Sequence, residues 1–318
     1  MIDVPSFAAR IRERFPLGLT AVLAVGGTRT TYMMDRNRQA ADPGKIDYRQ
    51  YGEDMLARIQ SLLRDYFDLG GQNVVIPVLS YQSVENLRGE AYAERTALIA
   101  RELMNDQWVA YFRELDIDPY FVGIDTLLRF PDKPTYYALG QDCARFNRAW
   151  SYQEGRRKLV FEIAPIPLFS IWRAHEVLGP ERMAQAEAQL ESASNLEAVH
   201  DILYRYYAQA LYGVELPVAD FYLGTSRNGD LKLRAMLPIS LLCGSATRFY
   251  YTPYPTMLIS REGLQAIFED LAFGRRLQSS QIDYSGKMTA ELLESEYERV
   301  QQLIADPNST VGLLRTIE

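Results

Sequence analysis

Short apolar segments recur along the chain, and turn residues bound each of them. Five are almost entirely apolar and a sixth is rich in aromatic residues; they are residues 20–25, 73–79, 120–124, 159–163, 219–223 and 248–252. Segments that are apolar at nearly every position suit strands that are buried on both faces of a sheet. The pattern therefore predicts a central sheet covered on two sides.

Amphipathic segments separate these predicted strands. Apolar side chains recur at helical spacing, with charged residues between them, in residues 51–69, 91–115, 196–212 and 290–304. Strands that alternate with helices are typical of a parallel sheet with right-handed crossovers. We predict one α/β domain over residues 1–318, with a central, mostly parallel sheet flanked by helices and a helical C-terminal tail. The polar stretch 131–157 is predicted to be an insertion or a flap.

Composition narrows the class of protein. Hydrophobic residues make up 47% of the chain and charged residues 24%, the balance of a soluble globular protein. The apolar runs fall short of the roughly 20 residues of a membrane span, and the first residues lack a signal-peptide layout. We therefore expect a cytoplasmic protein with at most peripheral membrane contact. The net charge of −7 disfavours nucleic acid as a partner.

Two predicted strands end in segments that suit an anion. They are "GGTRTTY" (26–32) and "GTSRNGD" (224–230), and each combines glycine, hydroxyl side chains and one arginine. Glycine lets the backbone approach a ligand closely, and hydroxyl, amide and guanidinium groups donate to phosphate oxygens. In an open parallel sheet, ligands bind at the carboxyl ends of the strands. The alternative is that both segments are ordinary turns, because glycine and threonine are common there.

The familiar catalytic motifs are missing from the sequence. It contains no G-x-x-x-x-G-K-[ST], no G-x-G-x-x-G after the first strand, no G-x-S-x-G and no D-D-x-x-D cluster. Only His175 and His200 are available as histidines, and His200 is expected to be structural. Cys143 and Cys243 lie far apart and show no metal-ligand spacing.

Aromatic residues are abundant and clustered. The chain has 21 tyrosines, 13 phenylalanines and 3 tryptophans, which gather in residues 169–177, 204–212 and 248–254. Most must be ordinary core or surface residues, but aromatic faces that line an apolar cavity would stabilise a carbocation. An anion site beside such a cavity suggests an isoprenoid diphosphate as ligand.

Four segments follow one another along the chain: "LTAVLAVGGTRTTY", "NVVIPVL", "ADFYLGTSRNGDLKL" and "RFYYTPYP". In this order they resemble the cis-prenyltransferase (undecaprenyl diphosphate synthase-like) superfamily, and "RGEAY" (88–92) and "DYS" (283–285) add to the likeness. Within that superfamily the sequence is most similar to the bacterial diterpene synthases of the tuberculosinol and kolavelool type. The resemblance implies a cis-prenyltransferase fold, a homodimer, and ionisation of a C20 allylic diphosphate that can already be cyclised. Water or proton loss then quenches the cation.

The resemblance also implies roles for single residues. Arg29 matches the family's diphosphate-binding arginine, and Arg227 matches a second anion contact. Tyr51 matches a tyrosine near the reacting carbon, although a surface tyrosine is the alternative. Tyr92 matches an aromatic pocket residue. The remaining expected substrate contacts come from the two loops and are Gly26, Gly27, Thr28, Thr30 and Ser226.

The sequence departs from the family where the acid should be. Gly26 replaces the essential aspartate, Thr30 replaces a second arginine, and Gly224 replaces the arginine of the elongating enzymes. Mg²⁺ is the cofactor that the resemblance implies, but no metal ligand is predicted because that acid is gone. Asp35 is expected to be a solvated charge rather than a substitute.

Two other functions remain open. A short-chain cis-prenyltransferase would condense isopentenyl diphosphate with an allylic primer, but it needs a second diphosphate site that Gly224 weakens. A catalytically inactive partner subunit of a prenyltransferase complex would explain Gly26.

Overall fold

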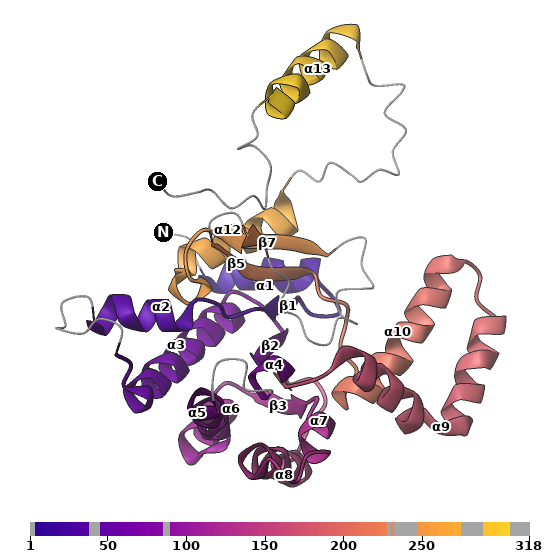
Figure 1. Cartoon of the computed structure of the whole chain (residues 1–318). Helices are drawn as coiled ribbons and strands as arrows, with labels where there is room; N and C mark the ends of the chain where they lie inside the picture. Colours follow the sequence, from indigo (N-terminus) through magenta and orange to yellow (C-terminus); the bar gives the residue numbers. More distant parts are fainter. Residues whose placement is uncertain are drawn as a thin grey trace.

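A sheet of six parallel strands lies at the centre of the protein (Figure 1). The computed structural model describes residues 4–37, 45–84, 90–227, 230–231, 247–274 and 289–305. The strand order is β3-β4-β2-β1-β5-β7, and the two-residue strand β6 pairs antiparallel with the end of β5. The strands are β1 (Thr20–Leu23), β2 (Asn73–Leu79), β3 (Ile117–Val122), β4 (Arg157–Ile163), β5 (Phe221–Arg227), β6 (Asp230–Leu231) and β7 (Arg248–Thr252).

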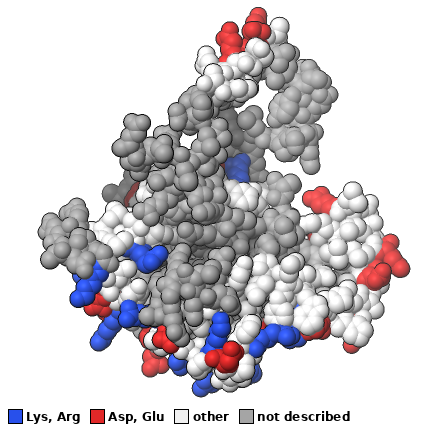
Figure 2. Space-filling model, in the orientation of Figure 1, with Lys and Arg blue, Asp and Glu red and all other residues white. Residues whose placement is uncertain are grey.

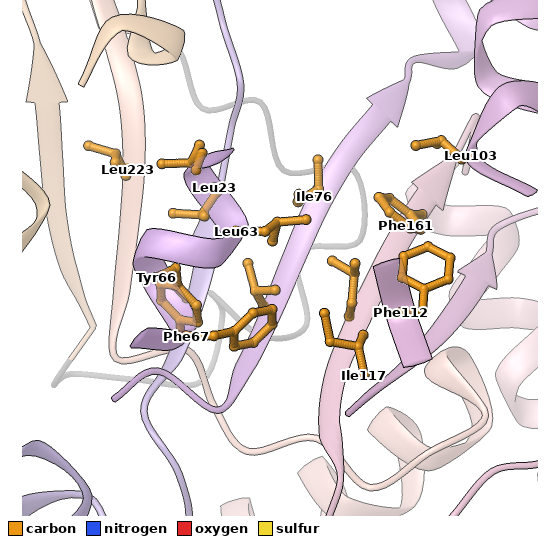
Figure 3. Close-up of a cluster of buried hydrophobic side chains, with 14 of the residues drawn as sticks. Leu23, Leu63, Tyr66, Phe67, Ile76, Leu103, Phe112, Ile117, Phe161 and Leu223 are labelled. Carbon is orange, nitrogen blue, oxygen red and sulfur yellow. The ribbon is translucent and has the colours of Figure 1, made fainter. Parts of the chain in front are cut away.

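The alternation of side chains along the strands divides the core into two layers. On one face, Leu23, Ile76, Phe161 and Leu223 join a large cluster of buried side chains (Figure 3). On the other face, apolar residues such as Val75 pack in a smaller cluster. Because both faces are buried, nearly every strand position is apolar, which is the pattern that marks these segments in the sequence.

Helices cover the two faces unequally. The larger cluster takes in residues of α1 (Val4–Arg14), α3 (Tyr48–Asp68), α5 (Glu90–Arg101), α6 (Asp106–Glu114), α8 (Pro134–Ala149) and α12 (Arg261–Phe273). The smaller cluster takes in residues of α10 (Leu196–Tyr212), which pairs with α9 (Pro167–Glu191) in a helical hairpin (Figure 1). Among the described helices, none has both the length and the hydropathy that a bilayer span requires.

Short elements complete the described chain. They are α2 (Thr28–Tyr32), the π-helical turn η1 (Met33–Asn37), α4 (Tyr81–Val84), the 3₁₀ turn η2 (Glu102–Met104), α7 (Asp125–Leu128), the 3₁₀ turn η3 (Thr256–Leu258) and α13 (Ala290–Ala305).

Tyr66 ties helix α3 to the sheet. Its buried hydroxyl donates to the backbone carbonyl of Leu19 or Asn73, which lie 2.8 and 2.7 Å away. Burial raises the pKa of this phenol well above its ordinary value, so the hydroxyl keeps its proton. The contact holds the end of α3 against the starts of β1 and β2.

The strands confirm the predicted α/β sheet, with corrections to several elements. Residues 131–157 are wrong as a flap, because most of them form α8, whose Tyr136, Leu139 and Cys143 are buried in the core. The predicted helix 91–115 is divided, since η2 and the cap residue Asn105 separate α5 from α6. Strand β3 begins three residues earlier than predicted and contains Pro119. Helix α9, which the apolar periodicity did not single out, is bent at Gly179 and Pro180.

Candidate functional site

The first glycine segment forms a tight turn at the carboxyl end of β1. Ala24 N–H still donates to Leu223 O of β5 at 2.9 Å, and the chain then leaves the sheet. Gly27 has a φ of 74°, a left-handed conformation in which other residues are strained. A Cβ placed on Gly27 would lie 2.6 Å from the Cβ of Pro255. Two features therefore require glycine at position 27. The backbone has a positive φ, and the turn that follows β7 leaves no room for a side chain.

Helix α3 brings a tyrosine to this turn. Asp47 caps the helix by accepting from the N–H groups of Arg49 and Gln50 at 3.0 and 3.2 Å, which places Tyr51 in the first turn. The hydroxyl oxygens of Tyr51 and Thr28 lie 2.7 Å apart in a hydrogen bond. Tyr51 is only 7% exposed, so it is not a surface residue. Two residues that the sequence separates by 23 positions thus meet at the carboxyl edge of the sheet.

An aromatic and thioether cluster surrounds Tyr51. Its ring stands edge-on to Tyr32 and Tyr48, with ring centres 5.7 and 6.2 Å apart, and Met55 and Met257 pack in the same cluster. Contacts of this kind hold a ring in one orientation. The loop, the hydroxyl and the ring are consequently fixed relative to one another.

The second glycine segment is not the loop that the sequence predicts. Gly224 and Thr225 continue strand β5 and pair with Tyr251 and Thr252 of β7, and the strand ends only at Arg227. A Cβ on Gly224 would lie 2.7 Å from the ring of Tyr222. The glycine here makes room for a neighbouring ring in the sheet rather than for a turn.

A pair of threonines, missed in the sequence, joins β5 to the turn after β7. Thr225 Oγ1 accepts a hydrogen bond from Thr256 N–H at 3.0 Å, and the two hydroxyls are also hydrogen-bonded to each other. Thr256 is fully buried, and it follows Pro255 directly. These bonds hold Pro255 in the position where it contacts Gly27. No motif marks the pair, because its members lie 31 residues apart.

The structure places the other predicted site residues as follows. Gly26 is buried in the turn, and Arg29 and Thr30 are half-buried in α2 directly after Thr28. Ser226 and Arg227 lie at the end of β5 and Tyr92 lies in α5, but their side chains are outside the described residues. Residues 283–285 and Cys243 lie outside them as well.

Two acidic residues, Asp35 and Glu162, lie outside the β1 turn. Asp35 forms an ion pair with Arg58 and is partly exposed, as expected of a solvated charge. Glu162, which the sequence analysis missed, is fully buried at the carboxyl end of β4, two strands from β1. In the described part of the chain, no group of three His, Cys, Asp or Glu residues could hold a metal ion. No chemical step is assigned to a metal ion.

A groove runs beside the Tyr51 turn. It encloses about 760 Å³ between α3 and the segment that comprises α5, η2 and α6. Its apolar lining includes Leu56, Ile99 and Trp108, and Arg95 lies over the ring of Tyr48 at 4.5 Å, at the same end of α3 as Tyr51. Charged and amide side chains, such as Arg49, Glu53 and Gln60, also line the groove, so its lining is mixed.

The remaining histidine and cysteine candidates lie elsewhere. His200 is on α10, where its Nδ1 is 3.1 Å from Asp201 Oδ1. Burial raises the pKa of the Cys143 thiol to about 12, which makes this residue a poor nucleophile. Neither residue belongs to an element of the β1 turn.

Comparisons with known proteins identify the fold. No protein-family model matches the sequence, and no curated protein sequence matches it. Among solved structures, lavandulyl diphosphate synthase from Lavandula x intermedia in complex with dimethylallyl diphosphate is similar, with a TM-score of 0.53 and 14% identity over 80% of this chain and 95% of that one. A probable undecaprenyl diphosphate synthase from Campylobacter jejuni gives a TM-score of 0.45 and 12% identity over 80% of this chain and 94% of that one. The chain therefore has the α/β fold of the cis-prenyltransferase structures, as its sequence motifs predict.

Proposed function

We propose that this protein is a terpene synthase that ionises a long allylic prenyl diphosphate and does not extend a chain. The observation that carries the proposal is the 2.7 Å hydrogen bond between Thr28 and Tyr51. It joins an anion-type turn to an aromatic side chain at the carboxyl edge of a parallel sheet, which is where such folds bind ligands.

The diphosphate would bind at the β1 turn. The donor groups of this turn are the backbone N–H groups of Gly26 and Gly27, the hydroxyls of Thr28 and Thr30, and the guanidinium of Arg29. Backbone N–H groups in a turn of this conformation make anion-binding concavities, and arginine matches phosphate oxygens with two parallel bonds. Ser226 and Arg227 at the end of β5 would add contacts from the neighbouring strand.

The hydrocarbon chain would occupy the groove along α3. Its volume of about 760 Å³ lies within the range of roughly 300–1,000 Å³ that is typical of small-molecule sites. Tyr48 and Gly52 line the groove in the same helical turns as Tyr51, so a chain bound there would place its head near the Thr28–Tyr51 bond. Tyr92 of α5 would be a further wall of this site.

The reaction would be a dissociation followed by a quench. The allylic carbon–oxygen bond breaks, and its electron pair leaves with the diphosphate. Arg29 and the donors of the turn stabilise the charge that develops on the leaving oxygens. The ring of Tyr51 would stabilise the cation, and its hydroxyl would orient a water molecule whose addition, with loss of a proton, gives an alcohol. Loss of a proton from the cation gives a hydrocarbon instead.

Two alternatives are each favoured by one observation. The similar lavandulyl diphosphate synthase is in complex with dimethylallyl diphosphate, which favours condensation of short prenyl diphosphates. Gly26 in place of the family's aspartate favours an inactive partner subunit. We prefer the synthase because of the cluster around Tyr51. A buried ring and hydroxyl that are held beside the β1 turn suit the stabilisation of a carbocation, whereas an inactive subunit would not need them.

The test is release of diphosphate from the purified chain. The substrates are geranylgeranyl diphosphate and a bicyclic C20 allylic diphosphate, each with and without isopentenyl diphosphate. Release without isopentenyl diphosphate supports the synthase, release only with it supports condensation, and no release in any mixture supports the partner subunit. Arg145→Ala is the matched control for variants of Arg29, because Arg145 is an exposed arginine of α8 that pairs with Asp142.

Gly26→Asp tests the departure at the family's acid position. A carboxylate in the β1 turn would recruit Mg²⁺ beside the diphosphate, so we expect activity to depend more strongly on Mg²⁺ than in the wild type. An absolute requirement in the wild type that the substitution leaves unchanged would mean that the metal is held elsewhere.

A further inference from the structure

The C-terminal helix α13 has an apolar face that is open to solvent. Tyr297, Val300 and Ile304 recur at the spacing i, i+3, i+7, and Ile304 is 69% exposed. Figure 1 draws α13 apart from every other labelled element. An isolated helix of this length is marginal in water, because packing of an amphipathic face supplies most helical stability. The helix therefore needs a surface on which to bury this face.

Helix α9 presents a matching surface. Leu168, Ile171 and Trp172 recur at the spacing i, i+3, i+4 near its start, and they are exposed, Leu168 by 80% and Trp172 by 50%. These three residues form the surface that we call the α9 stripe. Apolar ridges of this spacing on two helices pack into each other's grooves.

The distribution of exposed apolar side chains favours this pairing over other surfaces. Of 18 exposed large hydrophobic residues in the described chain, three lie in the α9 stripe and three on α13. The two helices therefore carry the densest apolar exposure, and one contact would cover both.

Charge points the same way. Residues 290–305 contain four glutamates and one arginine, and Glu294 and Glu298 are exposed beside the apolar face. Arg129 lies next to the α9 stripe, with its guanidinium 4.7 Å from the ring centre of Phe169 and 5.7 Å from that of Trp172. A glutamate of α13 would meet this guanidinium at the edge of an apolar contact, where an ion pair sets orientation.

The connection is long enough for the helix to reach its own chain. Residues 275–288 join α12 to α13, and these 14 residues span at most about 46–50 Å when extended. Asp270, near the end of α12, is bonded to Arg248 at the start of β7, so α12 ends at the amino edge of the sheet, whereas α9 begins at the carboxyl edge. Strands β7 and β4 are four places apart, about 19 Å at the usual strand spacing. Together with the length of a seven-residue strand, about 23 Å, this gives about 30 Å in the plane of the sheet.

We propose that α13 docks through Tyr297, Val300 and Ile304 onto the α9 stripe of its own chain, with Arg129 facing its glutamates. Helix α9 begins directly after β4, so the docked helix would stand at the carboxyl edge of the sheet, the edge that carries the β1 turn. The docked helix thus becomes part of the border of the candidate site.

Trp172 is a built-in reporter of this contact. Of the three tryptophans, Trp108 is fully buried and Trp150 is bonded to Asp118, so Trp172 dominates quenching by acrylamide. In the full-length chain we expect the double substitution Val300→Glu, Ile304→Glu to raise this quenching about twofold, because the apolar contact is lost. The matched control, Ser295→Glu with Gln302→Glu, adds the same charge on the opposite face and should change nothing. Equal quenching in the wild type and both double variants would overturn the proposal.

A disulfide identifies the chain on which α13 docks. Ile171→Cys with Val300→Cys, in a chain with Cys243→Ser, leaves Cys143 as the other thiol, and that thiol is buried. Mild oxidation should give a crosslinked monomer with faster mobility under denaturing, non-reducing conditions. A covalent dimer would overturn docking within one chain and assign the surface to a second copy. Absence of any crosslink, with Ile171→Cys labelled freely by a maleimide, would remove α13 from this surface.

Discussion

The β1 turn and the end of β5 look alike in sequence and differ in structure. Each contains a glycine, a threonine and an arginine after an apolar strand. At β1 the chain leaves the sheet, and Gly27 takes a positive φ against Pro255. At β5 the chain stays in the sheet through Arg227, and Gly224 is enclosed beside the ring of Tyr222. The same residue types therefore serve a turn in one place and a strand in the other.

The difference comes from what lies beside each segment. Thr225 is paired with Thr252 and bonded to Thr256, so β7 and the turn after it extend β5. Beyond Ala24, by contrast, the chain turns towards α2, where Thr31 N–H donates to Gly27 O at 2.9 Å. Partners that lie far along the chain decide whether glycine and threonine continue a strand. We therefore expect the β1 turn to carry binding and the end of β5 to support it.

The largest expected effect is on the rate of diphosphate release, and it should differ between substitutions of Arg29 and Arg227. Arg29→Ala should raise the barrier to diphosphate release by about 2–4 kcal/mol, as the loss of an oxyanion donor does. Arg227→Ala should cost less, because its strand end supports the turn rather than forming it. Steady-state kinetics of both variants beside Arg145→Ala give the comparison. Equal decreases in rate for the Arg29 and Arg227 variants would mean that both strand ends bind the diphosphate equally.

The next largest effect is on the free energy of unfolding, which alanine substitution should lower more at Gly27 than at Gly224. Gly27→Ala should cost roughly 2–4 kcal/mol, because left-handed strain of about 1–2 kcal/mol adds to the overlap with Pro255. Gly224→Ala should cost about 1–3 kcal/mol, since it meets the Tyr222 ring without a strained φ. Urea unfolding followed by circular dichroism measures both. If Gly224→Ala proved the more damaging, the contrast between turn and strand would be mistaken.

Substitutions of Thr225 and Thr28 should affect stability and activity in opposite order, with Thr225 more important for stability and Thr28 for turnover. Thr225→Val removes the acceptor of a buried N–H, which costs about 1–3 kcal/mol. Thr28→Val removes a part-buried bond to Tyr51 and should cost only about 0.5–1.5 kcal/mol. Turnover should nevertheless fall further in Thr28→Val. Parallel changes in stability and turnover for both variants would give the two threonines a common, structural role.

The smallest effect sharpens the role of Tyr51. Tyr51→Phe keeps the ring and deletes the oxygen that bonds Thr28. Substrate should still be consumed, while products shift from alcohol towards hydrocarbon. Tyr51→Ala should lose in addition the cation–π stabilisation of about 0.5–2 kcal/mol. Gas chromatography of the products decides, and an unchanged rate and product ratio in both variants would place Tyr51 outside the reaction.

Sequence patterns predicted the sheet better than the connections. Residues 73–79 and 248–252 match β2 and β7, because apolar side chains at successive positions record burial on both faces. Helix α8 escaped prediction because its buried face, with Tyr136, Leu139 and Cys143, is narrow and lies among polar residues. Helix α9 carries its apolar residues on an exposed face as well as a buried one, which hides the helical period.

The candidate site was predictable in part. Gly27 and Thr28 stand out locally, and family likeness drew attention to Tyr51, which the structure brings to Thr28. The role of Pro255 could not be read, since it depends on an approach between residues 228 positions apart. The pair Thr225 and Thr256 could not be predicted either, because no local sequence pattern marks two threonines that meet only in the folded chain.

The long separation between Gly27 and Pro255 has a consequence for biosynthesis. A ribosome adds about 5–20 residues each second. Pro255, which packs against Gly27, is therefore synthesised on the order of 10–50 s after the turn itself. For most of that time β1 also lacks its neighbour β5, before which Asp220 accepts a hydrogen bond from the Thr20 N–H. The nascent chain can order the half of the sheet that contains β2, β3 and β4 first, and the β1 turn is completed last, after β7 has been made.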